Sequence, residues 1–348
     1  MLFVRQGELL AQPFDADRLT LGGAVVRVAG PVAVNPAISL ATLAASPAGA
    51  IAYAASSVQS GQFVWVDRKG TKIEALGEPE QTPIAMPSIS PDGRRIAFSR
   101  AVGGNWDIWL MDMRGTMSRF TSDPALDMFP IWSADGRQIF FQSPRVQGPA
   151  PNLYVRSVAD GTPEELLLKS GLPKTPSAVS ADGRLLLYTL NTGTSAEIWS
   201  LPLTGDRTPR AFVKSSFNAS GGQFSPDGRW VAYQSDESGR NEIYLKAFPG
   251  PAERIQLSPG GGTQVRWGQR SAEVFYIAAD QRLNAVPVRL AANGALSLGS
   301  PKPLFQVSAI RQLGLQYVVS ADGQRFLLNT QTADPPSITM ILNWRGKP

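Results

Sequence analysis

The sequence of 348 residues contains neither cysteine nor histidine. Without histidine the chain cannot build Ser-His-Asp or Cys-His catalytic groups, or a histidine-based zinc, copper or non-haem iron site. Without cysteine it has no disulfides, thiolate nucleophiles or iron–sulfur clusters. Any chemistry must therefore come from carboxylates, Lys, Arg, Tyr or Ser.

Long hydrophobic runs are also missing. Residues 37–56 come closest to a membrane span, but Pro47 and Gly49 at their centre favour two strands and a turn. The opening residues, MLFVRQGE, do not form a signal peptide because charged residues interrupt them at once. We therefore expect no membrane span and no signal peptide in this chain.

Charge is sparse and mixed in sign. Only 18% of the residues are charged, the formal net charge is +5, and Lys and Arg never form a run of four. This pattern favours a mildly basic surface without a nucleic-acid partner. In contrast, 33 Gly and 28 Pro are typical of many short strands joined by tight turns, and 43% apolar residues exclude disorder.

A turn followed by an apolar run recurs seven times, starting at residues 46, 90, 133, 180, 225, 268 (degenerate) and 320. A third strand-like segment follows each of the first six turns, and a fourth begins at residues 119, 164, 210 and 254, which makes four short strands per repeat of about 45 residues. Such a period is the signature of propeller blades. The sequence thus predicts an all-β fold, a β-propeller of seven or eight four-stranded blades.

The turns have the form Ser-Pro-Asp-Gly or Ser-Ala-Asp-Gly. The Asp carboxylate can accept a local backbone N–H, and Gly suits a position of positive φ. We therefore assign these residues to turn formation rather than to catalysis or metal binding. They are Asp92, Gly93, Asp135, Gly136, Asp182, Gly183, Asp227, Gly228, Asp322 and Gly323.

The two ends of the chain do not complete the pattern. Residues 2–29 and 315–344 each supply three strand-like runs, whereas one blade holds four strands. Either there are eight blade positions with two three-stranded sheets at the seam, or there are seven blades with part of the N-terminus peripheral. The expected organisation is one domain over 1–348, with a partial blade at 1–36, six repeat blades at 37–314 and a partial blade at 315–348.

Several longer segments resemble one protein family. The repeated turns, FVWVDRKG (63–70), WDIWLMDM (106–113), FNASGGQFSPDGRWVAYQSDESGRNEIYLKAFPGP (217–251) and FLLNTQTADPPSITMILNW (326–344) resemble TolB-type, WD40-like propeller repeats. The resemblance is greater to the C-terminal propeller regions of bacterial, notably acidobacterial, serine/threonine protein kinases, and it covers essentially the whole chain. It implies a sensory or protein-interaction module that lies outside the cytoplasm.

The kinase itself is not in this sequence. The chain has no Gly-rich phosphate loop, no VAIK-like lysine, no HRD or DFG motif and no nucleophile elbow. We expect a non-catalytic binding or scaffold propeller without a metal or cofactor, whose partner is a protein or peptide, with a small molecule as a second class.

Loops at one face of such a propeller and at its channel mouth are the natural binding surface. The candidate binding residues on those loops are Trp106, Asp127, Phe129, Asn218, Arg240 and Arg266. Ordinary loops whose aromatic residues cover the core are an equally good account of the same pattern.

Two other functions stay open. The adjacent carboxylates Asp236-Glu237 and Glu164-Glu165 would suit a carboxylate- or metal-dependent propeller hydrolase or lyase, although neighbouring residues in a strand point apart. The remaining alternative is a TolB-like envelope protein.

Overall fold

The computed structural model describes residues 1–5, 7–35, 40–46, 48–54, 61–80, 82–145, 150–159, 161–250, 254–290, 296–307, 314–331 and 338–344. These residues form strands and turns without a helix, so the predicted all-β class is confirmed. In this part of the chain no helix has the length and apolarity needed to cross a membrane.

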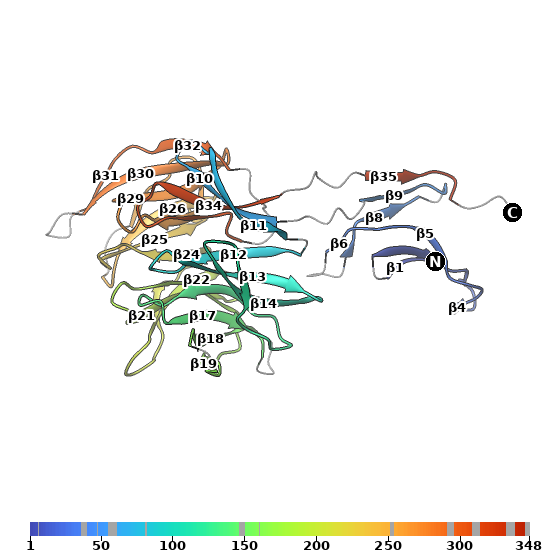
Figure 1. Cartoon of the computed structure of the whole chain (residues 1–348), viewed down its shortest axis with the longest axis horizontal. Coiled ribbons are helices and arrows are strands. Elements are labelled where there is room, and N and C mark those ends of the chain that lie inside the picture. Colours follow the sequence, from blue (N-terminus) through green and yellow to red (C-terminus); the bar gives the residue numbers. More distant parts are fainter. Residues whose placement is uncertain are drawn as a thin grey trace. The chain divides into compact units, whose positions relative to one another are not determined.

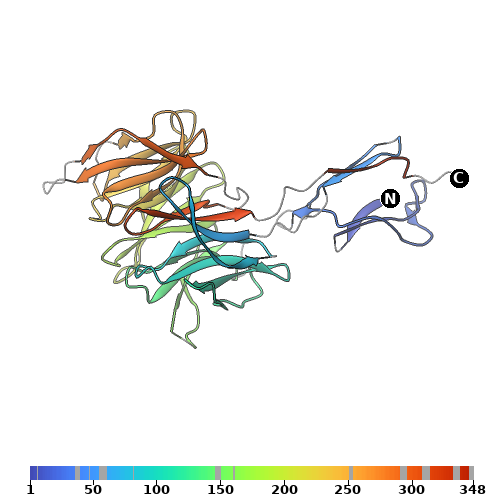
Figure 2. The same cartoon turned by 45° about the horizontal axis from the view of Figure 1, so that its top comes forward.

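The chain forms two compact units, one of Met1–Ser60 with Gln331–Pro348 and one of Gly61–Thr330. Figure 1 and Figure 2 show the strands of each unit. The N-terminal strands and the C-terminal strand belong to the smaller unit because they pair within it.

The smaller unit consists of two three-stranded sheets and two short hairpins. The strands in order of pairing are β1 (Leu2–Arg5), β2 (Glu8–Ala11) and β5 (Val26–Ala29); β35 (Ile338–Ile341), β9 (Ile51–Ala54) and β8 (Leu43–Ala45); β3 (Phe14–Asp15) with β4 (Thr20–Leu21); and β6 (Val34–Asn35) with β7 (Leu40–Ala41). Leu9, Ala29, Val32, Ile51 and Tyr53 form their buried core.

The described residues of the larger unit form six sheets. In pairing order the first four are β11 (Lys72–Glu80), β10 (Gly61–Asp67), β34 (Arg325–Gln331) and β33 (Tyr317–Val319); β12 (Ile84–Ile89), β13 (Arg95–Val102), β14 (Asn105–Asp112) and β15 (Met117–Arg119); β16 (Met128–Trp132), β17 (Gln138–Ser143), β18 (Asn152–Ser157) and β19 (Glu165–Leu168); and β20 (Lys174–Val179), β21 (Leu185–Asn191), β22 (Ala196–Pro202) and β23 (Arg210–Val213).

The last two sheets continue the same order. They are β24 (Ala219–Phe224), β25 (Trp230–Ser235), β26 (Glu242–Ala247) and β27 (Arg254–Gln256); and β28 (Gly262–Trp267), β29 (Glu273–Ala278) and β30 (Arg282–Leu290), which pairs with both β31 (Leu296–Leu298) and β32 (Lys302–Gln306). The added β30–β31 hairpin accounts for the longer interval between the last two repeat turns.

The described residues of the larger unit therefore hold six sheets, whereas the sequence predicts seven or eight blades. The strand after the first repeat turn, Ile51–Ala54, pairs with Ile338–Ile341 and Leu43–Ala45 in the smaller unit. Of the C-terminal runs, Tyr317–Val319 and Arg325–Gln331 share a sheet with the strands at 61–80. Six of the seven repeat turns therefore lie in sheets of the larger unit, and the strand that follows the turn at 46 lies in a sheet of the smaller unit.

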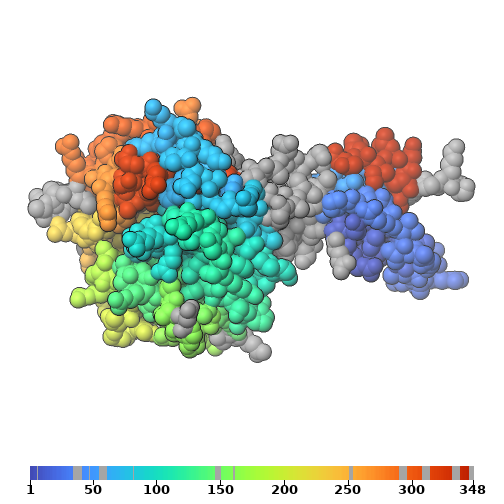
Figure 3. All heavy atoms as spheres, in the orientation of Figure 1, coloured from blue at the N-terminus to red at the C-terminus, as the bar shows by residue number. Residues whose placement is uncertain are grey.

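The six sheets follow one another around a ring. The innermost strands contact each other in the order β12, β16, β20, β24, β28 and β33, and β33 contacts β12 again. Where the ring closes, residues 61–80 in blue lie beside β34 in red, next to the last sheet in orange (Figure 3). The first sheet thus combines strands from both ends of the larger unit.

Hydrogen bonds link every pair of neighbouring sheets. Around the ring, the bonds run from Asn329 Nδ2 to the Ile84 carbonyl, Trp132 Nε1 to the Ser88 carbonyl, Thr175 Oγ1 to Gln142 Oε1, Gln223 Nε2 to the Ser177 carbonyl, Trp267 Nε1 to the Gln223 carbonyl and Tyr317 Oη to the Gln264 carbonyl, at 2.6–3.1 Å. Such bonds satisfy polar groups in the interior and fix the spacing between sheets.

One buried apolar cluster lies between each pair of neighbouring sheets, six in all among the described residues. Strand β13 shows how the sequence produces this arrangement. Ile96 and Phe98 face the first sheet, while Ala97 between them faces the third. Alternation in a strand that is covered on both sides thus gives two packed faces.

The Ser-x-Asp-Gly turns carry the same hydrogen bonds in five of the six sheets, and the described residues of the sheet with the degenerate turn at 268 lack them. In the second sheet the Ser90 hydroxyl donates to Asp92 Oδ1 at 2.6 Å and accepts from the Arg95 amide at 2.9 Å. The same Ser-to-Asp bond of 2.6 Å recurs in the turns of Asp135, Asp182, Asp227 and Asp322. The serine hydroxyl first, and then a backbone amide, hold the pKa of Asp182 below its usual value.

Candidate binding site in the central channel

A cavity of about 1140 Å³ runs through the middle of the larger unit. All six innermost strands, β12, β16, β20, β24, β28 and β33, contribute to its wall. This space is slightly larger than the usual range of small-molecule sites in proteins, which are mostly concave and preformed.

Bulges interrupt the innermost strands where they approach the channel. The pairing register shifts inside β12, β16, β20, β24 and β28. In three of these strands a residue other than glycine has positive φ, namely Met86 at 54°, Phe129 at 59° and Gln264 at 57°, and all three line the cavity. Such backbone costs free energy and concentrates at functional sites.

Neutral polar side chains make up much of the wall. The lining includes Thr175, Thr189, Ser220, Gln223, Gln234, Thr263 and Gln264. Three hydrogen bonds hold Gln264. Its side-chain Oε1 accepts from the backbone N–H of Gln316 at 2.7 Å. Its backbone carbonyl accepts from the Tyr317 hydroxyl at 2.8 Å, and its backbone N–H donates to Gln234 Oε1 at 3.3 Å. Hydroxyls and amides of this kind can bind the backbone of an extended peptide.

Arg266 is a cation in the channel wall without a carboxylate partner among the described residues. The one hydrogen bond of its guanidinium in that part of the chain runs from Nη1 to the Val265 carbonyl at 2.7 Å. Burial lowers the pKa of Arg266, although arginine starts so high that the side chain stays charged. The channel therefore holds a positive charge that the protein leaves uncompensated.

Two further candidate residues meet near the channel. Phe129 lines the cavity, and Trp106 packs in the same cluster as Phe129 and Met86, with 8% of its surface exposed. Trp106 therefore supports the bulged strands from behind and is not itself a lining residue.

The other three candidates lie away from the channel wall. Asn218 joins two loops, because its Nδ2 donates to Asp236 Oδ2 at 2.6 Å and its Oδ1 accepts from the Ala196 amide at 3.0 Å. Arg240 Nε contacts Glu242 Oε1 at 2.8 Å. Asp127 is fully buried and paired with Arg145. The structure thus brings only part of the predicted set together.

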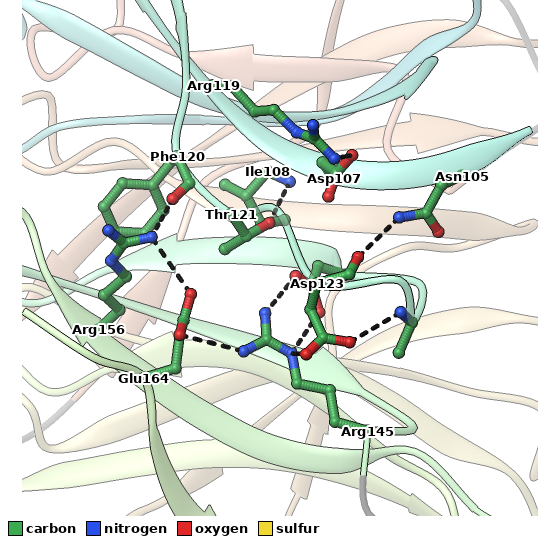
Figure 4. A network of polar contacts seen from close by, with 12 residues as sticks. Asn105, Asp107, Ile108, Arg119, Phe120, Thr121, Asp123, Arg145, Arg156 and Glu164 are labelled. Carbon is green, nitrogen blue, oxygen red and sulfur yellow. Dashed lines mark hydrogen bonds and ion pairs between the residues drawn. The ribbon is translucent and has the colours of Figure 1, made fainter. Parts of the chain in front are cut away.

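A cluster of acidic and basic side chains surrounds Arg145, between the second and third sheets (Figure 4). Asp127, Asp123 at 3.7 Å and Glu164 at 3.3 Å are its partners, and Glu164 also contacts Arg156 at 3.2 Å. Burial alone would lower the pKa of Arg145, but the hydrogen bonds and charges of these carboxylates outweigh it and raise the pKa. Each of these charged side chains is paired with one of opposite charge, which suits a structural role.

The adjacent carboxylates singled out as catalytic alternatives are occupied in the same way. Glu164 contacts Arg145 and Arg156, and Glu165 contacts Arg207 at 2.8 Å. Asp236 accepts from Asn218, and Glu237 contacts Arg254 at 2.7 Å. Neither pair presents two free carboxyl groups to one substrate position, as glycoside hydrolysis requires.

Sequence reasoning misses Gln264, Met86 and the buried Lys174. The strand pattern gives no sign of a bulge at Met86 or Gln264, since neither residue is one that favours positive φ. Lys174 Nζ donates to the Leu172 carbonyl at 2.6 Å and to Asn152 Oδ1 at 3.1 Å, and burial lowers its pKa to about 8.

Comparisons with known proteins agree with this fold. Residues 35–206 match a family model described as the TolB β-propeller domain. Over 44 residues, 12% of this chain, the sequence is 50% identical to the Tol-Pal system protein TolB of Anaeromyxobacter dehalogenans, and over 99 residues, 28% of the chain, it is 26% identical to that of Francisella tularensis. The matches span 10% and 23% of the length of those relatives.

Solved structures extend the likeness to most of the chain. A putative TolB from Agrobacterium tumefaciens superposes with a TM-score of 0.61 and 16% identity, over 79% of this chain and 99% of that one. The hydrazine synthase of Kuenenia stuttgartiensis gives 0.52 and 14%, over 86% and 94%. At these identities the likeness concerns the fold alone. Together, the comparisons support a β-propeller fold similar to that of TolB.

Proposed function

We propose that this chain is a non-catalytic binding module, a six-bladed β-propeller whose central channel takes up an extended segment of a protein or peptide. The observation that carries the proposal is the channel wall, where strained, bulged strands present hydroxyls, amides and apolar side chains around about 1140 Å³. Strained backbone at one position of several repeats indicates that the arrangement serves a purpose other than stability.

The polar groups of the larger unit favour binding over catalysis. The carboxylates considered for hydrolysis are engaged by arginines or by Asn218. Many side chains of the channel wall, such as Thr263 and Gln264, are hydroxyls and amides, which are neither acids nor bases at neutral pH and bind ligands through hydrogen bonds.

A channel-blocking variant tests this function. Thr263 lines the cavity, and Thr263→Trp places an indole in it. The matched control is Thr204→Trp, since Thr204 is exposed and outside the lining set. Immobilised protein is incubated with pools of acetylated random hexapeptides, and mass spectrometry identifies those retained. We expect retention by the wild type and by Thr204→Trp and loss with Thr263→Trp. Equal retention by all three proteins, or none by the wild type, would refute channel binding.

The wider setting is also a proposal. Resemblance to kinase-linked propellers supports a sensory part of a kinase-containing protein, and the similarity to Tol-Pal system proteins supports an extracytoplasmic envelope protein. The native transcript distinguishes them. An in-frame kinase domain upstream of Met1 would support the first, and a transcript that encodes an export signal without a kinase domain would support the second.

A further inference from the structure

The arginines of the larger unit fall into two groups. One group contacts a carboxylate, as Arg68 does with Glu273 at 2.9 Å and Arg100 with Glu80 at 2.5 Å. Arg266, Arg270 and Arg325 line the channel without an ion pair among the described residues, and of these three only Arg266 is half-buried, whereas the other two are exposed. An arginine in such a position without a carboxylate raises the question of what its free donors are for.

The guanidinium of Arg266 has N–H groups that donate no hydrogen bond within the described part of the chain. An arginine side chain carries five N–H groups in a planar fork that matches a carboxylate with two parallel hydrogen bonds. Nη1 donates to the Val265 carbonyl, and no other hydrogen bond of this side chain occurs in the described part of the chain. The nearby Tyr317 hydroxyl does not neutralise the arginine, since it already donates to the Gln264 carbonyl and burial raises its pKa.

The surroundings select the kind of anion. The residues that precede Arg266 on its strand, Thr263, Gln264 and Val265, also line the channel and are neutral. A free, highly hydrated ion would leave the length of the channel unused, whereas an extended peptide could bind the hydroxyls and amides along the wall and bring one carboxylate to Arg266. A carboxylate would also neutralise the guanidinium, whose positive charge is costly when it is buried without a partner.

On these grounds, and resting on the proposed function, we propose that Arg266 is a specificity residue that binds a carboxylate of an extended peptide in the channel. Because a chain terminus and an Asp or Glu side chain share this chemistry, the test must separate the two sources. The proposal also implies that the protein selects against peptides that carry no carboxylate.

The test uses the full chain and three pools of acetylated hexapeptides. The first pool has a free C-terminal carboxylate and no Asp or Glu, the second is amidated with one Asp or Glu, and the third is amidated without either. Wild type, Arg266→Met, Arg266→Lys, Thr263→Trp and Thr204→Trp are compared. We expect the wild type to retain the first or the second pool at least about tenfold more than the third. Retention of the first pool identifies a chain terminus and of the second a side chain.

The variants separate this inference from the function on which it rests. Arg266→Met should abolish the preference for the carboxylate pool, and Arg266→Lys should keep part of it because an ammonium retains charge without the fork. If Thr263→Trp removes retention while Arg266→Met leaves the preference intact, the carboxylate inference is wrong and channel binding stands. If Thr263→Trp changes nothing, or the wild type retains no pool, both are wrong. Unfolding curves establish that each variant is folded.

Discussion

Arginine side chains have opposite surroundings in two regions of the larger unit, the interfaces between the sheets and the channel that the sheets enclose. Arg145, between the second and third sheets, contacts Asp127, Asp123 and Glu164, and its pKa is raised. Arg266, in the channel wall, has no carboxylate partner in the described part of the chain, and its pKa is lowered. An interior charge that is compensated contributes to the fold, whereas one that is left uncompensated is available for a ligand.

The largest expected effect comes from removing the charge at the interface. Arg145→Met leaves the fully buried Asp127 without its cation, so we expect the free energy of unfolding to fall by about 3–5 kcal/mol. Urea unfolding measures the loss. Arg207→Met, which breaks an exposed pair with Glu165, is the control and should cost less than about 1 kcal/mol. Similar losses in the two variants would contradict the distinction between buried and exposed pairs.

Substitution of two glycines with similar backbone conformation compares how tightly the sheet interface and the channel are packed. Both have positive φ, but a Cβ on Gly115 would lie 2.4 Å from the Cα of Gly77 in the neighbouring sheet, whereas a Cβ on Gly221 in the channel would meet nothing within 4 Å. We expect Gly115→Ala to cost about 2–4 kcal/mol and Gly221→Ala about 1 kcal/mol, the cost of the backbone alone. Equal shifts of the urea midpoint would show that the interface yields as easily as the channel.

A smaller, pH-dependent effect is expected in the repeat turns. Ser180→Ala removes the hydroxyl that lowers the pKa of Asp182 and should cost about 1 kcal/mol at pH 7. Because the folded pKa is depressed, this stabilisation is present above the unfolded value of about 3.9 and is lost as the pH falls through the folded value.

The difference between wild type and Ser180→Ala should therefore shrink between pH 7 and pH 3. A remainder persists, because the Ser180 hydroxyl also accepts from the Leu185 amide at 2.9 Å. A difference that stays constant over this range would exclude the carboxylate as its cause.

The smallest effect on stability is expected in the channel. Arg266→Met removes an uncompensated charge, so the free energy of unfolding should stay within about 1 kcal/mol of the wild type or rise. This is the opposite of the result expected for Arg145→Met by the same urea measurement. A loss as large as that of Arg145→Met would show that Arg266 is needed for folding, and the comparison between the two regions would fail.

Many strands could be predicted from the sequence, but the assignment of strands to sheets could not. Alternating residues such as Ile96, Ala97 and Phe98 predict a strand covered on both faces, and they pack in that way. The turn at 46 resembles the others, yet its strand belongs to the smaller unit. A strand's own residues do not encode which distant strand becomes its partner, because pairing depends on all competing edges.

The candidate site was only partly predictable for the same reason. Loop position places Phe129 and Arg266 among the candidates, and both line the channel. Asp127 and Arg240 satisfy the same criterion, but each contacts a charged neighbour instead. No local pattern distinguishes an exposed loop charge from a paired one, since the partner comes from another strand.

By itself the sequence determined the all-β class, the repeated turns and the absence of histidine and cysteine chemistry, because these follow from residue types and their local spacing. Only the tertiary structure decided that six sheets enclose the channel, that β10 and β34 share one of them, and that Arg145 is compensated while Arg266 is not. Those properties depend on distances between residues far apart in the chain, which only folding fixes.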